Sequence, residues 1–326
     1  MSNNTNEQMN RQERAAENVE QFFSFTEKIQ TEAYQPIKSG LKFYDDLMDG
    51  GPSAQTLTIL LAEQGAGKTI LMQQLAESIA TKQKRRVVYL NFEMPAEQLF
   101  SRALSARIYA HGKIEMTQKQ ILRGYLWTDR QRSEVLDTID EYKRESLPYI
   151  SYNPKNVKPD LEALECYLDE LSKEPEHAPA LFVDYLQLIQ SDRRQEIKDR
   201  LTQALVDLKQ YAIKNNTIVF LISAINRETK KSGKKITASS ARDTSAIEYQ
   251  ADYLISLENY KEQAKANKNG RQRMILYLLK NRDGKSGLYS IIERDGKNNL
   301  FVDADQPGSM KKSAFEIDDE TEIEMV

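Results

Sequence analysis

One stretch of the chain has the residue types and the spacing of a phosphate-binding loop. It reads Ala62-Glu-Gln-Gly65-Ala66-Gly67-Lys68-Thr69-Ile70 and lies between a predicted strand and a predicted helix. In that context, backbone N–H groups converge on phosphate oxygens and the helix N-terminus adds partial positive charge. A lysine here neutralises the β- and γ-phosphates, and a threonine hydroxyl binds Mg²⁺. The pattern predicts a site for ATP and Mg²⁺ that runs from Gly65 to Ile70. The alternative is a chance Gly-Lys-Thr in an ordinary turn, since Ala62 stands where the usual motif begins with glycine.

Two acidic residues follow apolar runs and are candidates to complete this site. Glu93 directly follows RVVYLNF (86–92), and Asp184 lies within ALFVDYLQLI (180–189). Ligands of open parallel sheets bind outside the carboxyl ends of the strands, so both side chains are expected beside the phosphate loop. Asp184 is then the second holder of Mg²⁺ with Thr69, and Glu93 is the base that activates water. The ordinary alternatives are an aspartate that caps a turn and a glutamate that favours a helix N-terminus.

The rest of the chain supplies the elements that must position these residues. Its 326 residues are 40% hydrophobic and 29% charged, enough for a sizeable folded core. Continuous apolar runs alternate with helical stretches, which indicates a mostly parallel sheet with helices on both faces. The predicted strands are 56–62, 86–92, 147–152, 180–189 and 217–223, and the predicted helices are 68–82, 95–111, 129–146, 159–173 and 195–214.

Beyond residue 252 the rhythm changes to strands joined by short turns, which predicts antiparallel hairpins at the sheet's edge. The expected organisation has three parts. Residues 1–36 form a polar start and a helical arm over about 11–31, residues 37–305 form the folded domain, and residues 306–326 form an acidic tail. That tail holds six acidic residues and no basic residue after Ala314. It is expected to be a solubilising, unstructured end; the alternatives are a partner-binding segment and a competitor for nucleic acid.

Five further motifs follow the phosphate loop in a fixed order, and together they resemble the ATPase domain of DnaB-type replicative DNA helicases. These motifs are NFEMPAEQLFSRALSARI (91–108), LFVDYLQLI (181–189), ISAINRE (222–228), RDTSAIEYQAD (242–252) and LKNRDGKSG (279–287). The similarity spans about 37–303. It implies a RecA-like P-loop fold, ATP hydrolysis, and a ring of subunits, most often six.

The resemblance also assigns roles to single residues. Lys68 and Thr69 would bind nucleotide and Mg²⁺, Glu93 would be the catalytic glutamate, and Asp184 would be the Walker B aspartate. Lys280 and Arg282 match a Lys-x-Arg pair that reaches the γ-phosphate held by the neighbouring subunit. Without the resemblance, both would be taken for solvated residues before the NRDG turn, on one of the added edge strands.

Two departures from the family pattern stand out. The family has a glutamine, which links nucleotide state to DNA, where this chain has Ala224; Ser223 or Asn226 could take over that coupling. The family also carries an N-terminal helical domain that docks primase, whereas about 35 residues precede the ATPase domain here. The resemblance implies single-stranded DNA, further copies of the chain, and a primase or a loader as partners. The second departure implies that a primase would be recruited in a different way.

Basic residues gather where the family places its DNA-binding loops. Arg227, Lys230, Lys231, Lys234, Lys235 and Arg242 lie within sixteen positions, and Arg193 and Arg194 form a second, smaller group. Dense positive charge on flexible backbone suits binding to phosphates without base specificity. Composition alone would favour an ordinary solvated loop.

Composition excludes several other classes. The chain has one cysteine and two histidines, too few for a disulfide framework or a His/Cys zinc site, and this favours a cytoplasmic setting. No apolar run is long enough for a membrane span. The leading interpretation is a ring-forming, ATP-dependent DNA helicase. The alternative is a RecA-like DNA-binding ATPase that acts in recombination or loading without unwinding, and a nucleotide-dependent scaffold is a third possibility.

Overall fold

In a computed structural model the chain divides into two units, Met1–Pro36 and Ile37–Val326. The structure describes residues 36–153, 157–173, 178–190, 196–225, 236–240, 245–260 and 270–304. In the first unit it otherwise describes four residues, all helical: Val19, Glu20, Phe23 and Ser24. The remainder of the predicted arm at 11–31 and the whole of the acidic tail at 306–326 lie outside the described residues.

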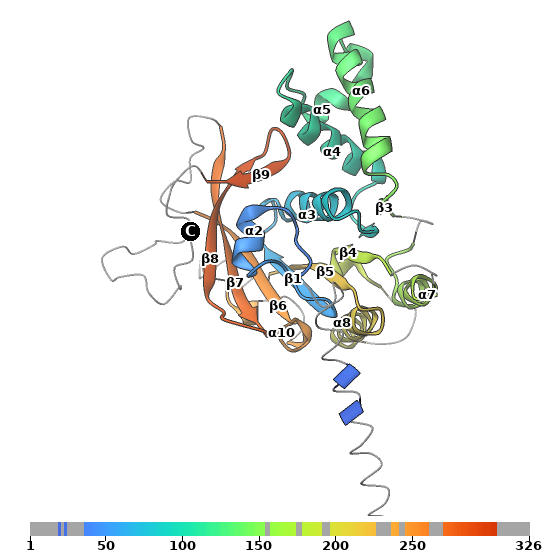
Figure 1. Ribbon diagram of the computed structural model, residues 1–326, viewed down its shortest axis with the longest axis vertical. Coiled ribbons are helices and arrows are strands. Elements are labelled where there is room, and N and C mark those ends of the chain that lie inside the picture. The colour runs from blue at the N-terminus through green and yellow to red at the C-terminus, as the bar shows by residue number, and fades with distance from the viewer. Residues whose placement is uncertain are drawn as a thin grey trace, which may run out of the picture. The chain divides into compact units, whose positions relative to one another are not determined.

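A nine-stranded sheet crosses the second unit in the order β3-β2-β4-β5-β1-β6-β7-β8-β9 (Figure 1). The strands from β3 to β6 are parallel, and β7, β8 and β9 follow as antiparallel neighbours. Their bounds are β1 Thr56–Ala62, β2 Val87–Asn91, β3 Ile150–Tyr152, β4 Ala180–Asp184, β5 Ile218–Ala224, β6 Tyr253–Asn259, β7 Gln272–Asn281, β8 Leu288–Asp295 and β9 Leu300–Asp303. The predicted mixed sheet with antiparallel C-terminal strands is confirmed.

Helices cover both faces of this sheet (Figure 1). The longer ones are α3 Lys68–Lys82, α4 Ala96–His111, α6 Asp129–Glu145, α7 Leu161–Leu171 and α8 Ile197–Lys214. The shorter ones are α2 Lys42–Leu47, α5 Gln118–Ile121 and α10 Ala246–Gln250, with 3₁₀ turns η2 Gly124–Leu126, η4 Leu186–Leu188 and η5 Ala238–Ser240. No helix among these described elements is long and apolar enough to cross a membrane.

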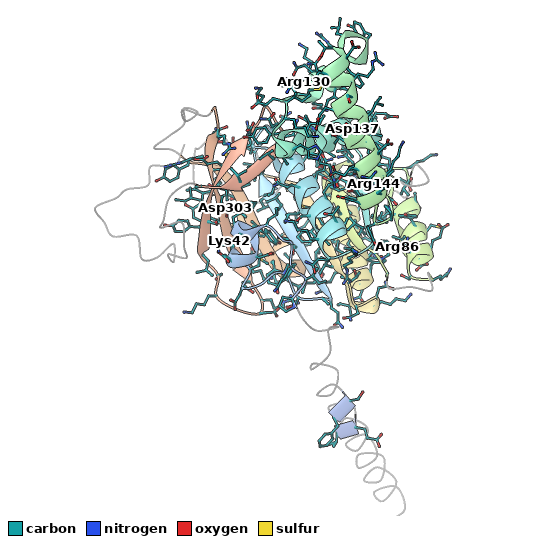
Figure 2. The ribbon with its side chains drawn as sticks, turned by 45° about the horizontal axis from the view of Figure 1, so that its top comes forward. Lys42, Arg86, Arg130, Asp137, Arg144 and Asp303 are labelled. Atoms are coloured by element: carbon teal, nitrogen blue, oxygen red, sulfur yellow. The ribbon has the colours of Figure 1, made fainter. Side chains whose placement is uncertain are left out.

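Three helices form a small group of their own on one side of the sheet. α4, α5 and α6 enclose a cluster that includes Ile108, Met116 and Val135. A capping box closes the N-terminus of α6, where Thr128 and the third helical residue, Gln131, each bond the other's backbone N–H. The opposite face of α6 is charged, and Figure 2 shows Arg130, Asp137 and Arg144 spread along it.

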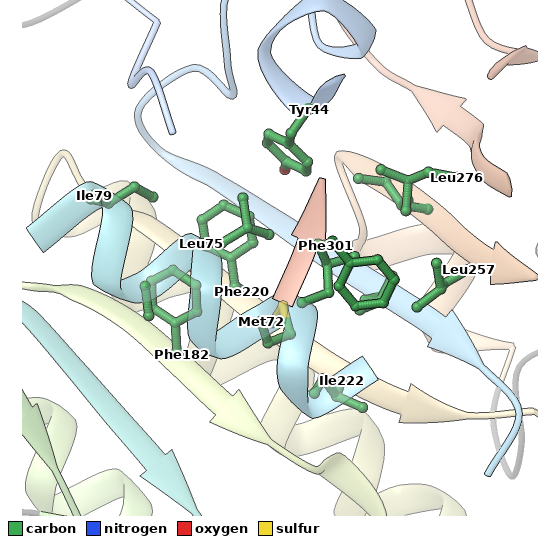
Figure 3. Close-up of a cluster of buried hydrophobic side chains, with 14 of the residues drawn as sticks. Tyr44, Met72, Leu75, Ile79, Phe182, Phe220, Ile222, Leu257, Leu276 and Phe301 are labelled. Atoms are coloured by element: carbon green, nitrogen blue, oxygen red, sulfur yellow. The ribbon is translucent and has the colours of Figure 1, made fainter. Parts of the chain in front are cut away.

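The core has one cluster on each face of the sheet, as expected for strands buried on both sides. Figure 3 shows the first cluster, where Met72 and Leu75 of α3 pack over Phe220 of β5 and Phe301 of β9. The second cluster joins the other face to α7, α8 and α10. Seven-residue β1 is buried at every position, which fixes its carboxyl end, and the loop that follows it, at the centre of the sheet.

One predicted strand is shorter than its apolar run. The run 180–189 predicted a strand throughout, but β4 stops at Asp184 and the chain turns into η4. Leu186 and Ile189 are nevertheless fully buried, because the turn packs into the second core cluster. The apolar residues beyond Asp184 therefore reflect burial of the turn rather than strand pairing.

Candidate nucleotide site

The phosphate loop joins the end of β1 to the start of α3, and its glycines take backbone angles that other residues avoid. Gly65 has φ 85° and Gly67 has φ 97°, both in the left-handed region. Gly67 directly precedes α3, so the first free N–H groups of the helix face the loop. Lys68 and Thr69 begin the helix itself. This is the strand–loop–helix geometry that binds phosphate.

The carboxyl ends of β2 and β4 lie side by side near this loop. Asn91 and Asp184 are the last residues of these strands and face each other in register. Asp184 is fully buried. Its Oδ2 accepts hydrogen bonds from Asn91 Nδ2 at 3.2 Å and from Tyr89 Oη at 3.4 Å. These two bonds hold the carboxylate in one orientation.

Asn91 also fixes the backbone that carries Glu93. Its Oδ1 accepts hydrogen bonds from the N–H groups of Glu93 at 2.9 Å and Met94 at 2.6 Å. One buried amide thus bridges the two acidic residues that the sequence predicted for the site. Sequence reasoning missed Asn91, although the signal was present: a polar residue near the end of an otherwise apolar strand, two positions before Glu93. The Glu93 side chain itself is exposed.

The charges around Asp184 show which groups the fold brings together. Burial raises the pKa of Asp184 to about 6. The Thr69 hydroxyl and the positive charge of Lys68 act in the opposite direction, while the negative charge of Glu93 adds to the increase. Lys68, Thr69 and Glu93 therefore all lie close enough to influence Asp184. Burial lowers the pKa of Arg102 of α4, and the negative charges of Asp184 and Glu93 oppose this change. The sequence did not single out Arg102.

The residues present fit a nucleotide-bound Mg²⁺. The second carboxylate oxygen of Asp184, Oδ1, is buried and accepts no hydrogen bond of normal geometry from the described residues. In the described part of the chain no three His, Cys, Asp or Glu residues come together as a self-contained metal site. Mg²⁺ prefers oxygen ligands and usually keeps waters and substrate phosphates in its shell. Thr69 and Asp184 would therefore supply the protein's part of a site that the nucleotide completes.

We expect the stabilisation of the protein by Mg²⁺ and ADP to increase as the pH rises through about 6. The pKa of Asp184 is raised from 3.8 to about 6 by folding. Without metal, the folded state loses up to about 3 kcal/mol of stability as the pH rises from about 4 to about 6. A bound cation would remove this cost. The test is the thermal unfolding midpoint with and without Mg²⁺ and ADP from pH 5 to 8.

Asp184→Asn is the control, because an amide does not titrate. The step near pH 6 should disappear in this variant, while the titration of the ADP phosphates remains as a common background. An identical Mg²⁺-dependent profile in both proteins would contradict a metal role for Asp184.

Lys280 and Arg282 lie at the opposite end of the strands from the phosphate loop, beside the amino-terminal ends of the parallel strands. They are at the end of β7, and Asn281 pairs with Tyr253 at the amino-terminal end of β6, which runs parallel to β1. Seven-residue β1 separates the two edges by about 20 Å at ~3.3 Å per residue. Neither side chain can reach the phosphate loop of its own chain. The expectation that they lie on an edge strand is wrong in detail, because β7 has β6 and β8 on its two sides.

In this structure Arg282 is docked on its own chain. Its Nη1 contacts Asp252 Oδ1 at 2.8 Å, and its Nη2 donates to the carbonyl of Tyr249 at 3.3 Å. Asp252 is buried and is also bonded by Lys209 Nζ at 2.5 Å. The Arg282 side chain is nevertheless half exposed (51%), so it remains accessible from outside the chain.

At position 224, where an alanine replaces the family's glutamine, the backbone is bonded by an amide side chain from the turn after the neighbouring strand β4. Gln187 of η4 donates from Nε2 to Ser223 Oγ at 2.9 Å, and its Oε1 accepts the N–H of Ala224 at 3.1 Å. The turn after β4 is therefore tied to the end of β5 by a residue that the sequence did not single out. Asn226, the other residue expected to compensate, lies outside the described residues.

All the predicted DNA-binding residues lie outside the described part of the chain. They are Arg193, Arg194, Arg227, Lys230, Lys231, Lys234, Lys235 and Arg242. The described flanks do show where two of the segments that carry these residues begin: one follows Gln190 after β4, and the other follows Ile225 after β5. β4 and β5 are neighbours in the sheet, and their carboxyl ends share the edge that carries the phosphate loop.

The sheet, with its phosphate loop between β1 and α3, has a RecA-like fold. The family described as the DnaB-like helicase C-terminal domain matches residues 36–299, nearly the whole of the described chain. The protein therefore belongs to this family, and the resemblance found in the motifs is confirmed. Membership implies a nucleotide-binding ATPase domain.

Individual relatives are distant. A probable replicative DNA helicase of Trieres chinensis is 26% identical over 281 residues, which are 82% of this chain and 58% of that protein. The chain thus spans little more than half the length of that relative. Among solved structures, the ATPase domain of G40P superposes with a TM-score of 0.72 at 18% identity, covering 88% of this chain and 98% of that one. A DnaB-like replicative helicase described with its interactions with primase gives 0.70 at 18% identity, covering 88% and 66%. The two structural matches support the fold alone.

Proposed function

We propose that this protein is an ATP-driven DNA helicase that works as a ring, most simply of six subunits, and moves along single-stranded DNA during replication. One observation carries the proposal. Within a DnaB-like ATPase domain, the P-loop and both carboxylates share one edge of the sheet, whereas Lys280 and Arg282 lie at the other. An ATP site divided in this way is complete only when a second copy of the chain supplies the missing charges.

The chemistry of the site follows from its residues. Lys68 would neutralise the β- and γ-phosphates, and Thr69 and Asp184 would hold Mg²⁺, which balances charge on the phosphate oxygens. Glu93 would take a proton from the attacking water as that water bonds to the γ-phosphorus and ADP leaves. Asn91 favours this geometry, because it bonds both Asp184 and the backbone of Glu93.

The partners proposed are single-stranded DNA, identical subunits, and a primase or a loader. A ring needs head-to-tail contacts between copies, which the division of the site between two edges supports. A primase is a reasonable partner because one of the structurally similar helicases is described with its interactions with primase.

We place the DNA path along the basic segments that follow β4 and β5. Each phosphate contact releases counterions, so binding to single strands should weaken with salt at a slope of roughly −0.7 per contact. Replacing Lys230, Lys231, Lys234 and Lys235 together by alanine should flatten that slope and reduce DNA-stimulated ATPase activity. Basal ATPase activity and ring assembly should remain, because none of these residues is among those proposed to hold the nucleotide.

Titration of labelled oligonucleotides at several salt concentrations measures this effect. Poly-dT and mixed-sequence strands should respond equally, because phosphate contacts carry no sequence information. Four exposed lysines elsewhere, Lys84, Lys119, Lys143 and Lys285, are the matched control. An unchanged slope in the first variant would move the DNA path elsewhere, with Arg193 and Arg194 the next residues to replace.

A forked duplex tests the function as a whole. Substrates with a 5′ tail, a 3′ tail or both are incubated with the protein, with and without ATP and Mg²⁺. ATP-dependent strand separation on a tailed substrate is the expected result. DNA-stimulated ATP hydrolysis without any strand separation would favour instead a RecA-like recombination or loading factor.

A further inference from the structure

The C-terminal hairpin made by β8 and β9 returns to the phosphate loop. Arg294 of β8 lies opposite Phe301 of β9 in the strand pairing. From β8, Arg294 Nη1 donates a hydrogen bond to the carbonyl oxygen of Gly65 at 2.5 Å. A Cβ atom added to Gly67 would lie 2.9 Å from Arg294 Cδ and 3.1 Å from the ring of Phe301. The hairpin thus bonds the loop at Gly65 and approaches it closely at Gly67.

This hairpin is firmly attached to the helix that starts at the loop. Gln74 of α3 donates from Nε2 to the carbonyl of Phe301 at 2.8 Å, and its Oε1 accepts the N–H of Phe301 at 2.7 Å. The Phe301 ring is buried beside Met72 and Leu75 of the same helix (Figure 3). Arg294 is therefore carried by a strand pair whose distance from α3 is fixed by both packing and hydrogen bonds.

Within the loop, the N–H of Ala66 donates to the carbonyl of Glu63 at 3.2 Å. Among the described residues, apart from its chain neighbours, no atom lies within 4 Å of the position that a Cβ atom of Gly65 would take. Two of three consecutive residues are glycines, which have the largest backbone freedom to lose when a loop becomes ordered. If a fixed contact already holds the loop, less of that entropy is lost when a phosphate binds. The bond from Arg294 to Gly65 is a contact of this kind.

The surroundings of the guanidinium also suit a phosphate site. Arg294 is half-buried, and its Nε is buried without a hydrogen-bond partner among the described residues. Burial lowers the pKa of Arg294, but a guanidinium remains charged at neutral pH. A desolvated positive charge beside the loop favours an anionic ligand in it.

We propose that Arg294 is a positioning residue for the phosphates of the bound nucleotide, supplied by the same chain. It holds the segment from Gly65 to Gly67 in the conformation that receives phosphate, through its bond to the Gly65 carbonyl. The proposal rests on the proposed function insofar as the loop must bind a nucleoside di- or triphosphate. Arg294 is distinct from Lys280 and Arg282, which lie about 20 Å away at the other edge of the sheet.

Binding and turnover of three full-length variants test this role. Arg294→Gln keeps a hydrogen-bond donor without the charge, Arg294→Lys keeps the charge with a different reach, and Lys297→Gln removes a positive charge from the turn of the same hairpin. Lys297 pairs with Glu115, away from the loop. Affinity for Mg²⁺ with ADP is measured with a fluorescent ADP analogue, and KM and kcat are measured for ATP hydrolysis.

Arg294→Gln should weaken ADP binding and raise KM by about tenfold, the scale of one charge-assisted hydrogen bond. kcat should change by less than about twofold, because Arg294 does not touch the reacting atoms in the proposed mechanism. Arg294→Lys should recover part of the affinity, and Lys297→Gln should match the wild type. The thermal unfolding midpoint without nucleotide separates these effects from a general loss of folding.

Three results of the binding and turnover assays would overturn the proposal: unchanged ADP affinity in Arg294→Gln, an equal loss in Lys297→Gln, or a fall confined to kcat. If Arg294→Gln and Arg294→Lys both lower the unfolding midpoint and lose the same affinity, Arg294 has a structural role only, which also overturns it. Failure of the proposed function would look different, because the wild-type protein would then bind no ADP or hydrolyse no ATP.

Discussion

Replacing Glu93 by glutamine should leave Mg²⁺-ATP binding close to the wild-type value while hydrolysis falls by about 10²-fold or more. The size of the loss is that of a missing general base. Binding should survive because the backbone N–H of Glu93 donates to Asn91, and this bond does not depend on the side chain that is changed. The Glu93 side chain is also exposed rather than packed. Single-turnover hydrolysis and equilibrium binding of a fluorescent ATP analogue measure the two quantities separately.

Two further variants serve as comparisons for Glu93→Gln. Lys68→Ala removes the charge proposed to neutralise the phosphates and should lower both binding and hydrolysis. Glu97→Gln is the matched control, because Glu97 is also exposed and lies in the first turn of α4, four residues along the chain. It should hydrolyse ATP at the wild-type rate. Near-normal turnover of Glu93→Gln would reassign the base, with Glu63 of the phosphate loop the next acidic residue to replace.

Much of the site could be predicted because its parts are local in sequence. A strand, a glycine-containing loop and a helix N-terminus lie within 56–82, and their residue types specify one another at short range. The parallel arrangement then brings Asp184 and the segment containing Glu93 to the same edge as the loop, since all three follow parallel strands. The fold class followed from the same alternation of apolar runs and helices.

The residues that the sequence did not reveal act through contacts between distant positions. Asn91 bonds Asp184 across 93 positions, Gln187 bonds Ser223 across 36, and Arg294 bonds Gly65 across 229. An amide or a guanidinium on a strand or turn has no periodicity that identifies its partner. Only the strand order, in which β4 lies beside β2 and the last hairpin returns toward α3, brings these groups together.

The early end of β4 is another feature that the sequence alone could not reveal. Burial and strand pairing both produce apolar runs, so the run 180–189 could not by itself show where β4 stops. The end of β4 matters for the geometry of the candidate site, because it turns the chain at Asp184 and allows Gln187 to reach back to the end of β5. This turn links Asp184, in the candidate nucleotide site, to the end of β5, where the basic segment begins.

The proposed division of the site between two subunits predicts activity that reappears on mixing two inactive proteins. Arg282→Ala should retain nucleotide binding and lose hydrolysis by about 10³-fold, the lower end of the range for an arginine supplied to a γ-phosphate. Lys68→Ala should be inactive for the separate reason given above. In randomly mixed rings, about a quarter of the interfaces would pair an intact phosphate loop with an intact Arg282. ATPase activity should therefore recover in part, in proportion to that fraction.

The mixing experiment must distinguish a loss of catalysis from a loss of the stability that Arg282 gives to its own chain. Asp252 is buried and would lose one of its two cationic partners in Arg282→Ala, while Lys209 would remain at 2.5 Å. Arg282→Lys keeps a positive charge beside Asp252 but lacks the planar fork of arginine, so it should restore stability better than hydrolysis. Lys285→Ala, an exposed change in the following turn, is the matched control and should be fully active.

Native mass spectrometry of the mixture shows whether both proteins enter the same rings. Recovery that rises and falls with the mixing ratio, in rings that contain both proteins, would support a trans role for Arg282. Mixed rings with no recovered hydrolysis would remove that role. Arg282 lies about 20 Å from its own phosphate loop, across the length of β1. Such a result would leave Arg282, which pairs with Asp252, and Lys280, which donates to the carbonyl of Glu248, as structural residues rather than parts of the nucleotide site.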